Sequence, residues 1–389
     1  MLNRITDWLK ENLKGDPFIW SIIMLLSLIS VAVVYSASSS LAFQKKDGDT
    51  MYYLIKHGGL IIGSLVLVWL AHKVDYKYYS RLSRLALIIS APLLLLTFLM
   101  GGELNGASRW LMIPIINQSF QPSDLAKLAL ITNLASMLAK RQANIEDFKG
   151  SFIPIVMWCG IICGLIALSN LSTAMILFST CLLLMFIGRV PMKYLAMLVL
   201  VGAICGTIAL TLGQRLGTAI NRIKQFAEIS ANDDADIPYQ AEQAYIAIWN
   251  GGLFGKGPGN SDLKYFLPQS SSDFIYAIII EEYGFIGGIF ILFLYLALLY
   301  RGMKTVMKSD RAYGGLLSAG LAFSLVGQAM INMGVAVGLG PITGQPLPLL
   351  SMGGTSLLFT GLSLGIILSV SRGDLIESNS VETKHATAA

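Results

Sequence analysis

Residues 273–300 read DFIYAIIIEEYGFIGGIFILFLYLALLY. Apart from its three acidic residues, this stretch is apolar over more than the roughly 20 residues that a helix needs to cross a membrane. Asp273 stands at its beginning, while Glu281 and Glu282 lie within it. A carboxylate is costly inside a bilayer, so a membrane-spanning segment that carries three of them needs a reason for each.

The composition of the whole chain is that of a membrane protein. Of its 389 residues, 54% are hydrophobic and only 13% are charged, whereas a soluble protein averages about 25% charged residues. Ten apolar runs read as membrane-spanning helices, and they leave no room for a separate soluble domain. We therefore expect an all-α integral membrane protein in which residues 1–389 form one domain with ten transmembrane helices. The predicted spans are residues 17–37, 52–72, 80–99, 122–139, 152–169, 172–187, 192–212, 274–299, 312–338 and 355–371.

Basic residues indicate how these spans are oriented. With the N-terminus in the cytoplasm, every inner segment carries Lys or Arg and the outer segments carry fewer, as the positive-inside rule requires. An even number of spans then places both termini in the cytoplasm. The net charge of +5 is therefore a topology signal, and since no nucleic-acid motif accompanies it, we expect no nucleic-acid partner. We expect residues 1–16 to be an amphipathic segment on the cytoplasmic membrane surface, and residues 373–389 to be a disordered tail.

The longest connection, residues 213–272, lies on the outer side between the seventh and eighth spans. A loop of this length between packed spans is usually functional. It begins with an amphipathic stretch, LGTAINRIKQFAEI, and continues to a predicted second helix, YQAEQAYIAIWNGG, which Gly251 and Gly252 end. Between the two lies an acidic cluster that is either a solvated loop or a site for a divalent cation. Its members are Asp233, Asp234 and Asp236.

The three carboxylates of the eighth span allow different interpretations. Asp273 is either an N-cap of the helix or, as a partly desolvated group between the long loop and the bilayer, a general base. On one continuous helix, Glu281 and Glu282 would lie about 12 Å deeper than Asp273 and on different faces. Because membrane-embedded carboxylates usually pair with cations, we expect the two glutamates to stabilise the bundle through ion pairs.

Candidate partners for these acids lie on or near the fourth span. Asp124 and Lys127 have i,i+3 spacing, so they form either a self-neutralising pair or part of an anion site. In the second case Arg109, just outside the membrane, and Lys127 would hold a pyrophosphate. Gln121 precedes this span and Ser356 opens the tenth, and both are candidate substrate-binding residues.

The segment GPITGQPLPLLSMGGTS, residues 340–356, cannot continue a helix because it contains three prolines. It is expected to be a rigid re-entrant or surface loop, and non-helical backbone at membrane depth must be buried in protein or line a cavity. Gln328 and Asn332 share a face of the ninth span and are expected to form a helix–helix hydrogen bond. Lys56 and His57 are expected to extend toward the outer interface.

Together, in this order and on this topology, the motifs resemble the FtsW/RodA family, the shape, elongation, division and sporulation proteins of bacteria. The motifs are NGASRW, QPSDLAK, YQAEQAYIAIWNGGLFGKGPGNS, LPQSSSDFIYAIIIEEYG and PITGQPLPLLSMGGTS. The resemblance implies a peptidoglycan glycosyltransferase of the cytoplasmic membrane that polymerises lipid II on the outer face. It also implies partnership with a class B penicillin-binding protein and other divisome proteins. The GPGNS motif resembles division-type (FtsW) members, which would place the protein at the septum.

Asp273 falls on the acidic position that the family is regarded as using for catalysis. The neighbouring positions differ, with Ser271 and Ser272 where His-Thr is common and Tyr276 where Phe is common. Asp124 stands in place of a usual Glu, which keeps the charge, and Asn170 stands where many members have an acid.

In the implied mechanism, Asp273 takes the proton of an acceptor sugar hydroxyl that displaces the lipid pyrophosphate. Arg109, Lys127 or a divalent cation, magnesium or manganese, would stabilise the departing phosphates. Since the donor brings its own activation, no nucleotide cofactor is expected. The alternatives are an elongation-type polymerase, a lipid II flippase or transporter, and a scaffold that recruits a transpeptidase.

Overall fold

The ten predicted spans all fall on helices of the computed structural model. It describes residues 12–45, 50–100, 102–104, 107–113, 118–212, 221–222, 224–228, 237–267, 271–308 and 311–388. Within them, seven helices are long and apolar enough to cross a membrane, and two shorter apolar helices cover residues 171–187 and 192–204. The chain is therefore a mostly helical, multi-pass membrane protein. The long helices are α2 (Pro17–Lys45), α3 (Thr50–Lys73), α4 (Tyr76–Met100), α5 (Pro122–Lys140), α6 (Ile153–Ser169), α7 (Leu171–Ile187), α8 (Met192–Leu212), α12 (Ile275–Lys308), α13 (Ala312–Ala336) and α14 (Gly354–Ala388).

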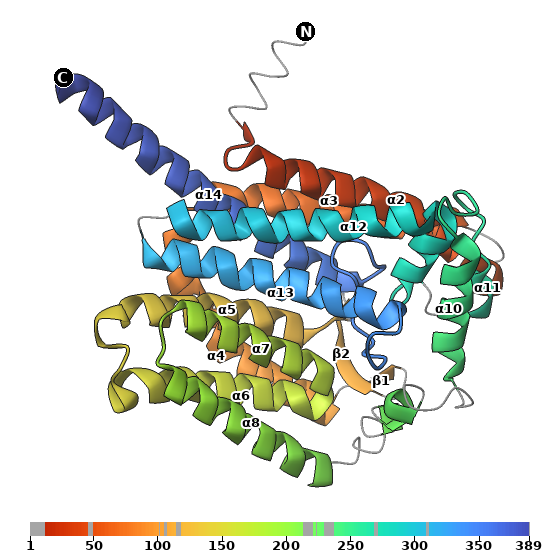
Figure 1. The fold of residues 1–389 in the computed structure, drawn as a ribbon, viewed down its shortest axis with the longest axis horizontal. Coiled ribbons are helices and arrows are strands. Elements are labelled where there is room, and N and C mark those ends of the chain that lie inside the picture. The colour runs from red at the N-terminus through yellow and green to blue at the C-terminus, as the bar shows by residue number, and fades with distance from the viewer. Residues whose placement is uncertain are drawn as a thin grey trace.

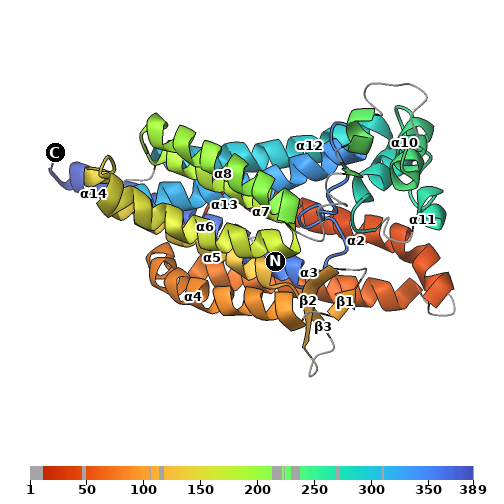
Figure 2. The same cartoon turned by 90° about the horizontal axis from the view of Figure 1, so that it is seen from below.

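The helices run roughly along one axis (Figures 1 and 2). Helix α13 is central, because it packs against α12, α5, α7 and α14, while α14 also packs along α3. The membrane-spanning parts of α13 and α14 are mostly buried, whereas α3 and α4 expose most of their apolar surface. We name the end of the bundle where α10 (Tyr239–Gly251) and α11 (Leu263–Phe266) lie the loop end.

Helix α12 consists of two helices that fold back on each other. Gly284 has φ 71° and ψ −175°, which breaks the helix between residues 275–283 and 285–308. The Tyr276 hydroxyl donates to the Gly288 carbonyl at 3.1 Å, although residues twelve apart in one continuous helix are about 18 Å apart. Ile280 also lies against Gly288. Residues 275–283 are therefore a short re-entrant helix, and only residues 285–308 continue as a long span.

This turn corrects the expected depth of the two glutamates. The Ser30 hydroxyl donates to the carbonyl of Leu350, whose neighbour Ser351 donates to the carbonyl of Ser272, next to Asp273. The Ser36 hydroxyl instead donates to Glu282. Six residues along α2 correspond to about 9 Å, and Ser36 is the nearer of the two to the loop end. The prediction that the glutamates lie deeper than Asp273 is therefore wrong. Asp273 lies at the deep tip of the re-entrant segment, and the glutamates lie toward the loop end.

The break in α12 is completed by the glycine-rich segment 252–257 of the long loop. The turn leaves peptide groups near Gly284 without helical partners, and in a membrane protein such groups must be satisfied by protein. Backbone atoms of Gly255 and Gly284 lie so close that a Cβ on either would overlap the other segment. Four hydrogen bonds join the segments, from the amides of Lys256 to Glu281 (2.9 Å), Gly257 to Glu282 (3.0 Å), Phe285 to Gly252 (2.9 Å) and Ile286 to Leu253 (3.4 Å).

The proline-containing segment between α13 and α14 enters the bundle, as the sequence predicts for a re-entrant loop. Residues 338–353 are non-helical, and Leu347, Leu349 and Leu350 are buried. The Tyr295 hydroxyl from α12 donates to the carbonyl of Pro348. The loop thus meets α12, α2 and the start of the re-entrant helix, and we name residues 340–353 the proline loop.

The expectation of an all-α protein is corrected by a small antiparallel sheet between α4 and α5. Its strands, in the order β1-β2-β3, are Gly102–Leu104, Ala107–Ile113 and Gln118–Phe120. Leu104 pairs with Ala107, and the two residues between them in sequence, Asn-Gly, are typical of two-residue hairpin loops.

The tail also differs from expectation. Helix α14 continues to Ala388 and extends away from the bundle (Figure 1), where the sequence suggested a disordered tail from residue 373. After Gly373 the tail contains neither glycine nor proline, so nothing in the backbone stops a helix that is already nucleated. Residues 1–11 of the expected amphipathic segment lie outside the described residues.

Candidate active site

Asp273 lies where the long loop turns into the re-entrant helix. Its side chain is partly exposed, and its Oδ1 accepts a hydrogen bond from the Ser272 hydroxyl at 3.0 Å. The backbone of Gly344, in the proline loop, approaches closely enough that a Cβ there would lie 3.5 Å from Oδ2. The carboxylate therefore faces the proline loop, held between two segments that are far apart in sequence.

Asn332 on α13 joins these two segments. Its side-chain amide donates to the backbone carbonyl of Asp273 at 2.9 Å and to that of Gln345 at 2.7 Å. One turn earlier, Gln328 donates to the carbonyl of Pro346 at 2.8 Å. The two residues were expected to bond a neighbouring helix. Both instead hold the proline loop, and only Gln328 also accepts from a helix, from Lys127.

Asp124 and Lys127, predicted from their spacing, form an ion pair with a separation of 2.9 Å. The Lys127 ammonium also donates to Gln328 at 3.3 Å. The pair is largely buried, and Asp124 Oδ2 has no hydrogen-bond partner among the described residues. The pair is therefore internally neutral, with one carboxylate oxygen still able to accept a hydrogen bond.

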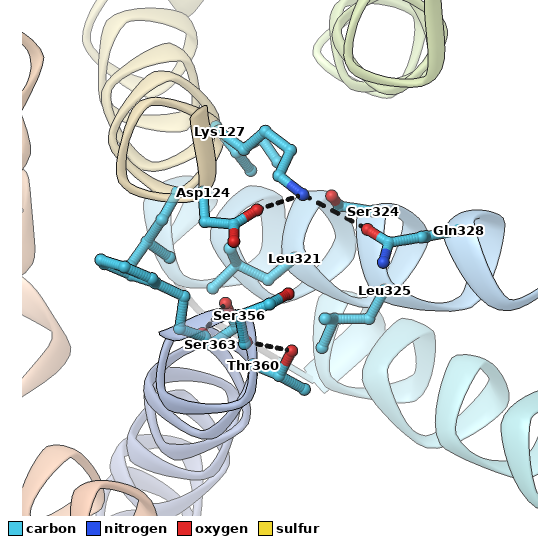
Figure 3. A pocket seen from close by; sticks show the side chains of 12 residues that line it. Asp124, Lys127, Leu321, Ser324, Leu325, Gln328, Ser356, Thr360 and Ser363 are labelled. Atoms are coloured by element: carbon cyan, nitrogen blue, oxygen red, sulfur yellow. Dashed lines mark hydrogen bonds and ion pairs between the residues drawn. The ribbon is translucent and has the colours of Figure 1, made fainter. Parts of the chain in front are cut away.

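This ion pair lines a pocket between α5, α13 and α14 (Figure 3). Ser356 contributes to the same wall, together with Ser324 and Thr360. The structure thus gathers three predicted residues, Asp124, Lys127 and Ser356, around one polar cavity. Asp273 does not line it, but is connected to it through α13, because Gln328 touches Lys127 and Asn332 touches Asp273.

Two further predicted residues lie nearby. Gln121 immediately precedes α5, where its backbone amide donates to the Thr355 hydroxyl at 3.3 Å and its side chain donates to Ser123. It therefore links the starts of α5 and α14. Arg109 lies on β2, but its side chain is outside the described part of the structure, so its predicted role stays a prediction.

Glu281 is fully buried among donors from the long loop. Its carboxylate pairs with the Lys256 ammonium at 2.8 Å and accepts from the Ser261 hydroxyl at 2.5 Å. The backbone amides of Asp262 and Leu263 also donate to it. The cation thus comes from the loop, not from the fourth span. The pairing with Asp262, at 2.7 Å, and with Glu281 raises the pKa of Lys256.

Glu282 has a different environment, as its position on another face of the helix predicts. The Ser36 hydroxyl of α2 donates to its Oε1, and Oε2 has no hydrogen-bond partner among the described residues. Within that part of the chain no cation lies in ion-pair distance. The expectation of an ion pair is therefore corrected for Glu282: its observed partner is a hydroxyl group.

The described side chains do not form a cage for a divalent cation. No group of three His, Cys, Asp or Glu residues comes together in the ranges that the structure covers. The acidic cluster Asp233, Asp234 and Asp236 lies outside those ranges, so its alternative as a cation site is untested.

Sequence reasoning missed several residues that shape the site, among them Ser30, Ser351 and Lys256. Each is a common residue type whose partner lies far away in sequence, so neither spacing nor periodicity marks it. One signal was present: a Ser at 351 within a proline-rich, otherwise apolar segment is a candidate for bonding freed backbone groups.

Together these features define a polytopic membrane protein with a partly exposed carboxylate held between a re-entrant helix and the proline loop. Residues 16–374 match the FtsW/RodA/SpoVE family of cell cycle proteins. The chain belongs to this family, which confirms the resemblance seen in its motifs.

Relatives match over nearly the whole length. The chain is 34% identical over 369 residues to stage V sporulation protein E of Bacillus subtilis, covering 92% of this chain and 98% of the relative. It is 34% identical over 372 residues to a probable peptidoglycan glycosyltransferase FtsW of Geobacter metallireducens, covering 93% and 96%.

Solved structures agree with the fold. The rod shape determining protein RodA of Thermus thermophilus superposes with a TM-score of 0.64 at 26% identity, over 94% of this chain and 98% of RodA. A chain from a peptidoglycan synthase complex that coordinates polymerization and crosslinking superposes with a TM-score of 0.70 at 24% identity, over 92% and 98%.

Proposed function

We propose that this protein is a peptidoglycan glycosyltransferase that polymerises lipid II at the outer face of the bacterial cytoplasmic membrane. Relatives that share about a third of its residues carry that activity in their names. The observation that carries the proposal is Asp273, a partly exposed carboxylate at the deep tip of a re-entrant segment, facing the proline loop. A base in this position meets a substrate whose lipid tail stays in the bilayer.

The proposed topology has ten membrane crossings, both termini in the cytoplasm, and the loop end outside. It is supported by the ten helices and by the basic inner segments. Residues 285–308 of α12 are long enough to cross by themselves, so the re-entrant helix need not be part of the crossing. We place the protein at the division septum, with a class B penicillin-binding protein and other divisome proteins as partners.

In the proposed reaction, the hydroxyl oxygen of the acceptor sugar attacks the anomeric carbon of the donor. The new glycosidic bond forms as the bond to the pyrophosphate oxygen breaks, and the pyrophosphate leaves with the bonding electrons. Asp273 accepts the hydroxyl proton. Lys127, and Arg109 from β2, supply positive charge for the departing phosphates.

The position of Lys127 in the polar pocket supports its proposed contact with a phosphate, but its existing contacts there weaken that interaction. Asp124 already neutralises the ammonium, so the lysine has to share its donors between Asp124, Gln328 and a phosphate. A phosphate oxygen that approaches the pair accepts charge-assisted hydrogen bonds from Lys127. It is also repelled by the Asp124 carboxylate. We infer that Asp124 mainly orients Lys127 and that Lys127 makes the contact.

The test is polymerisation of purified lipid II by the chain in complex with a class B penicillin-binding protein. Wild type should form glycan polymer, and Asp273→Asn, which keeps the shape and removes the base, should form none. Glu242→Gln is the matched control, because Glu242 is an exposed carboxylate of the same long loop. A preparation that moves labelled lipid II across vesicles without polymerising it would contradict the proposal and favour a flippase.

A further inference from the structure

A buried histidine on α3 has no part in the mechanism above. His57 is only 1% exposed, so it does not extend to the membrane interface as the sequence suggested. Its Nε2 lies 2.9 Å from the Ser30 hydroxyl of α2, which is itself completely buried. The Ser30 hydroxyl in turn lies 3.2 Å from the carbonyl of Leu350 in the proline loop.

The hydrogens of this chain can be assigned by their chemistry. A carbonyl accepts only, so the single proton of Ser30 goes to Leu350. His57 Nε2 must then be the donor to Ser30. In the neutral ring this leaves Nδ1 as an acceptor, and Nδ1 is buried with no hydrogen-bond partner among the residues that the structure describes. An unpaired acceptor here costs less than an unpaired N–H⁺, so the ring is the neutral Nε2–H form.

The chain continues from Leu350 to the catalytic carboxylate. The hydroxyl of Ser351 accepts from the Leu347 amide at 2.7 Å and donates to the Ser272 carbonyl at 2.6 Å. The Ser272 hydroxyl donates to Asp273 Oδ1 at 3.0 Å. The hydrogen bonds are joined by covalent backbone between Leu350 and Ser351 and by Ser272 itself, and apart from Ser272 and Asp273 the members are buried. A shift of Leu350 would therefore displace Asp273 through the intervening residues Ser351 and Ser272.

The backbone of the proline loop is strained at Leu349, so contacts from outside the loop have to stabilise it there. Leu349 has φ 63°, a left-handed conformation that costs a residue with a branched side chain about 1–2 kcal/mol. Such a conformation persists only where surrounding contacts impose it. The Ser30 hydroxyl donates to the carbonyl of Leu350, the residue after Leu349. This hydrogen bond therefore stabilises the backbone directly beside the strained residue.

We propose that His57 and Ser30 are positioning residues for Asp273. The histidine orients the serine hydroxyl, the serine fixes the strained turn at residues 349–350, and the turn sets the carboxylate through Ser351 and Ser272. Apolar residues at these two positions would leave no unpaired ring nitrogen. We therefore attribute the presence of the polar pair to the position that it imposes on Leu350. This inference rests on the proposed function, because it concerns the base of that reaction.

The test uses variants of the full-length chain in complex with its penicillin-binding protein partner. Ser30→Ala removes the link, and Ser27→Ala is its matched control, because the Ser27 hydroxyl is buried on the same helix and bonds no group in the described part of the chain. His57→Asn places an amide near Nδ1 and cannot reach Ser30, whereas His57→Gln places one near Nε2 and can. Two properties are measured: lipid II polymerisation kinetics, and amide exchange of Leu347 and Met352, whose amides bond within this network.

We expect Ser30→Ala and His57→Asn to lower the turnover rate by about 10- to 100-fold, as small displacements of a base do, at an unchanged half-saturating lipid II concentration. The Leu347 and Met352 amides should exchange faster in both. Ser27→Ala and His57→Gln should resemble wild type. Faster exchange of all amides, α10 included, would mean general destabilisation and would overturn the inference.

Three further outcomes separate this inference from the proposed function. If Asp273→Asn is inactive while Ser30→Ala and His57→Asn turn over normally, the positioning role is wrong and the proposed function stands. If Asp273→Asn itself polymerises lipid II, the assignment of Asp273 as the base is wrong and the positioning role is lost with it, even where exchange at Leu347 and Met352 changes. If wild type forms no polymer, the proposed function itself is wrong.

Discussion

The side-chain amide of Asn332 donates to the carbonyl of Asp273 and to the carbonyl of Gln345. One buried residue on the central helix therefore ties the re-entrant helix to the proline loop. Asn332 thus adds a tie from α13 to the direct bonds between the two segments, which run from the Ser351 hydroxyl to the Ser272 carbonyl and from the Met352 amide to the Ser271 carbonyl.

Replacing Asn332 by Leu should destabilise the protein and abolish polymerisation. The change leaves two backbone carbonyls without their donor, and each costs about 1–3 kcal/mol when buried. Thermal unfolding in detergent and lipid II polymerisation measure the two effects. Met333→Leu, a volume-conserving change at the next position, should leave both close to wild type. Wild-type activity of Asn332→Leu would show that the segments are held by other contacts.

The Asp124–Lys127 pair should behave as a coupled unit in stability but not in activity. Lys127→Met leaves a buried carboxylate unpaired, which costs about 3–5 kcal/mol. The double variant Asp124→Asn/Lys127→Met should recover most of this loss in melting temperature. If Lys127 contacts the phosphates, the double variant stays slow in polymerisation although it is folded. Recovery of both properties would assign the pair a purely structural role.

Alkaline pH should weaken the attachment of the long loop. Because its ion pairs raise the pKa of Lys256, the stability from this lysine is fully present below the pKa of an unfolded lysine, about 10.4, and is lost as pH rises through the higher folded value. The melting temperature of wild type should therefore fall above that pH more steeply than that of Lys256→Met. Parallel curves for the two proteins would contradict this.

Two glycine substitutions should separate backbone strain from steric overlap. Gly259→Ala meets only the cost of its φ of +84°, since nothing lies near the new Cβ, and should lose about 1 kcal/mol. Gly284→Ala adds a Cβ at 2.2 Å from the Leu253 carbonyl, so it should lose far more or fail to fold. Unfolding in detergent measures the stability of both variants. Equal losses of stability would mean that the loop moves to relieve the overlap.

Much of the architecture followed from apolar periodicity. Nine of the ten predicted spans each coincide with one helix, whereas the eighth is divided at Gly284. The second loop helix ends at Gly251, with Gly252 at φ 52° as its C-cap. The break at Gly284 could not be seen this way, because residues 274–300 form one apolar run. The re-entrant helix is buried all round, so it has no lipid-facing stripe to distinguish it from a span.

The site was predictable where contacts are local. The i,i+3 spacing of Asp124 and Lys127 was enough to indicate their pairing. The partner of Glu281 was not, because Lys256 is brought to it by backbone pairing between distant segments. The identification of Asp273 depended on the family motif, since its neighbours in space, Gly344 and Asn332, are far away along the chain.

The pairing of residues 252–257 with the break in α12 also bears on how the protein is made. Residues 252–257 are synthesised before residues 281–286. The segment that docks therefore exists before the helix break onto which it docks. The run 274–300 by itself has the composition of one straight helix, and a bilayer offers no partners to the peptide groups that the break exposes. The bend at Gly284 therefore depends on the docking of residues 252–257, because their backbone supplies the hydrogen bonds that the break requires.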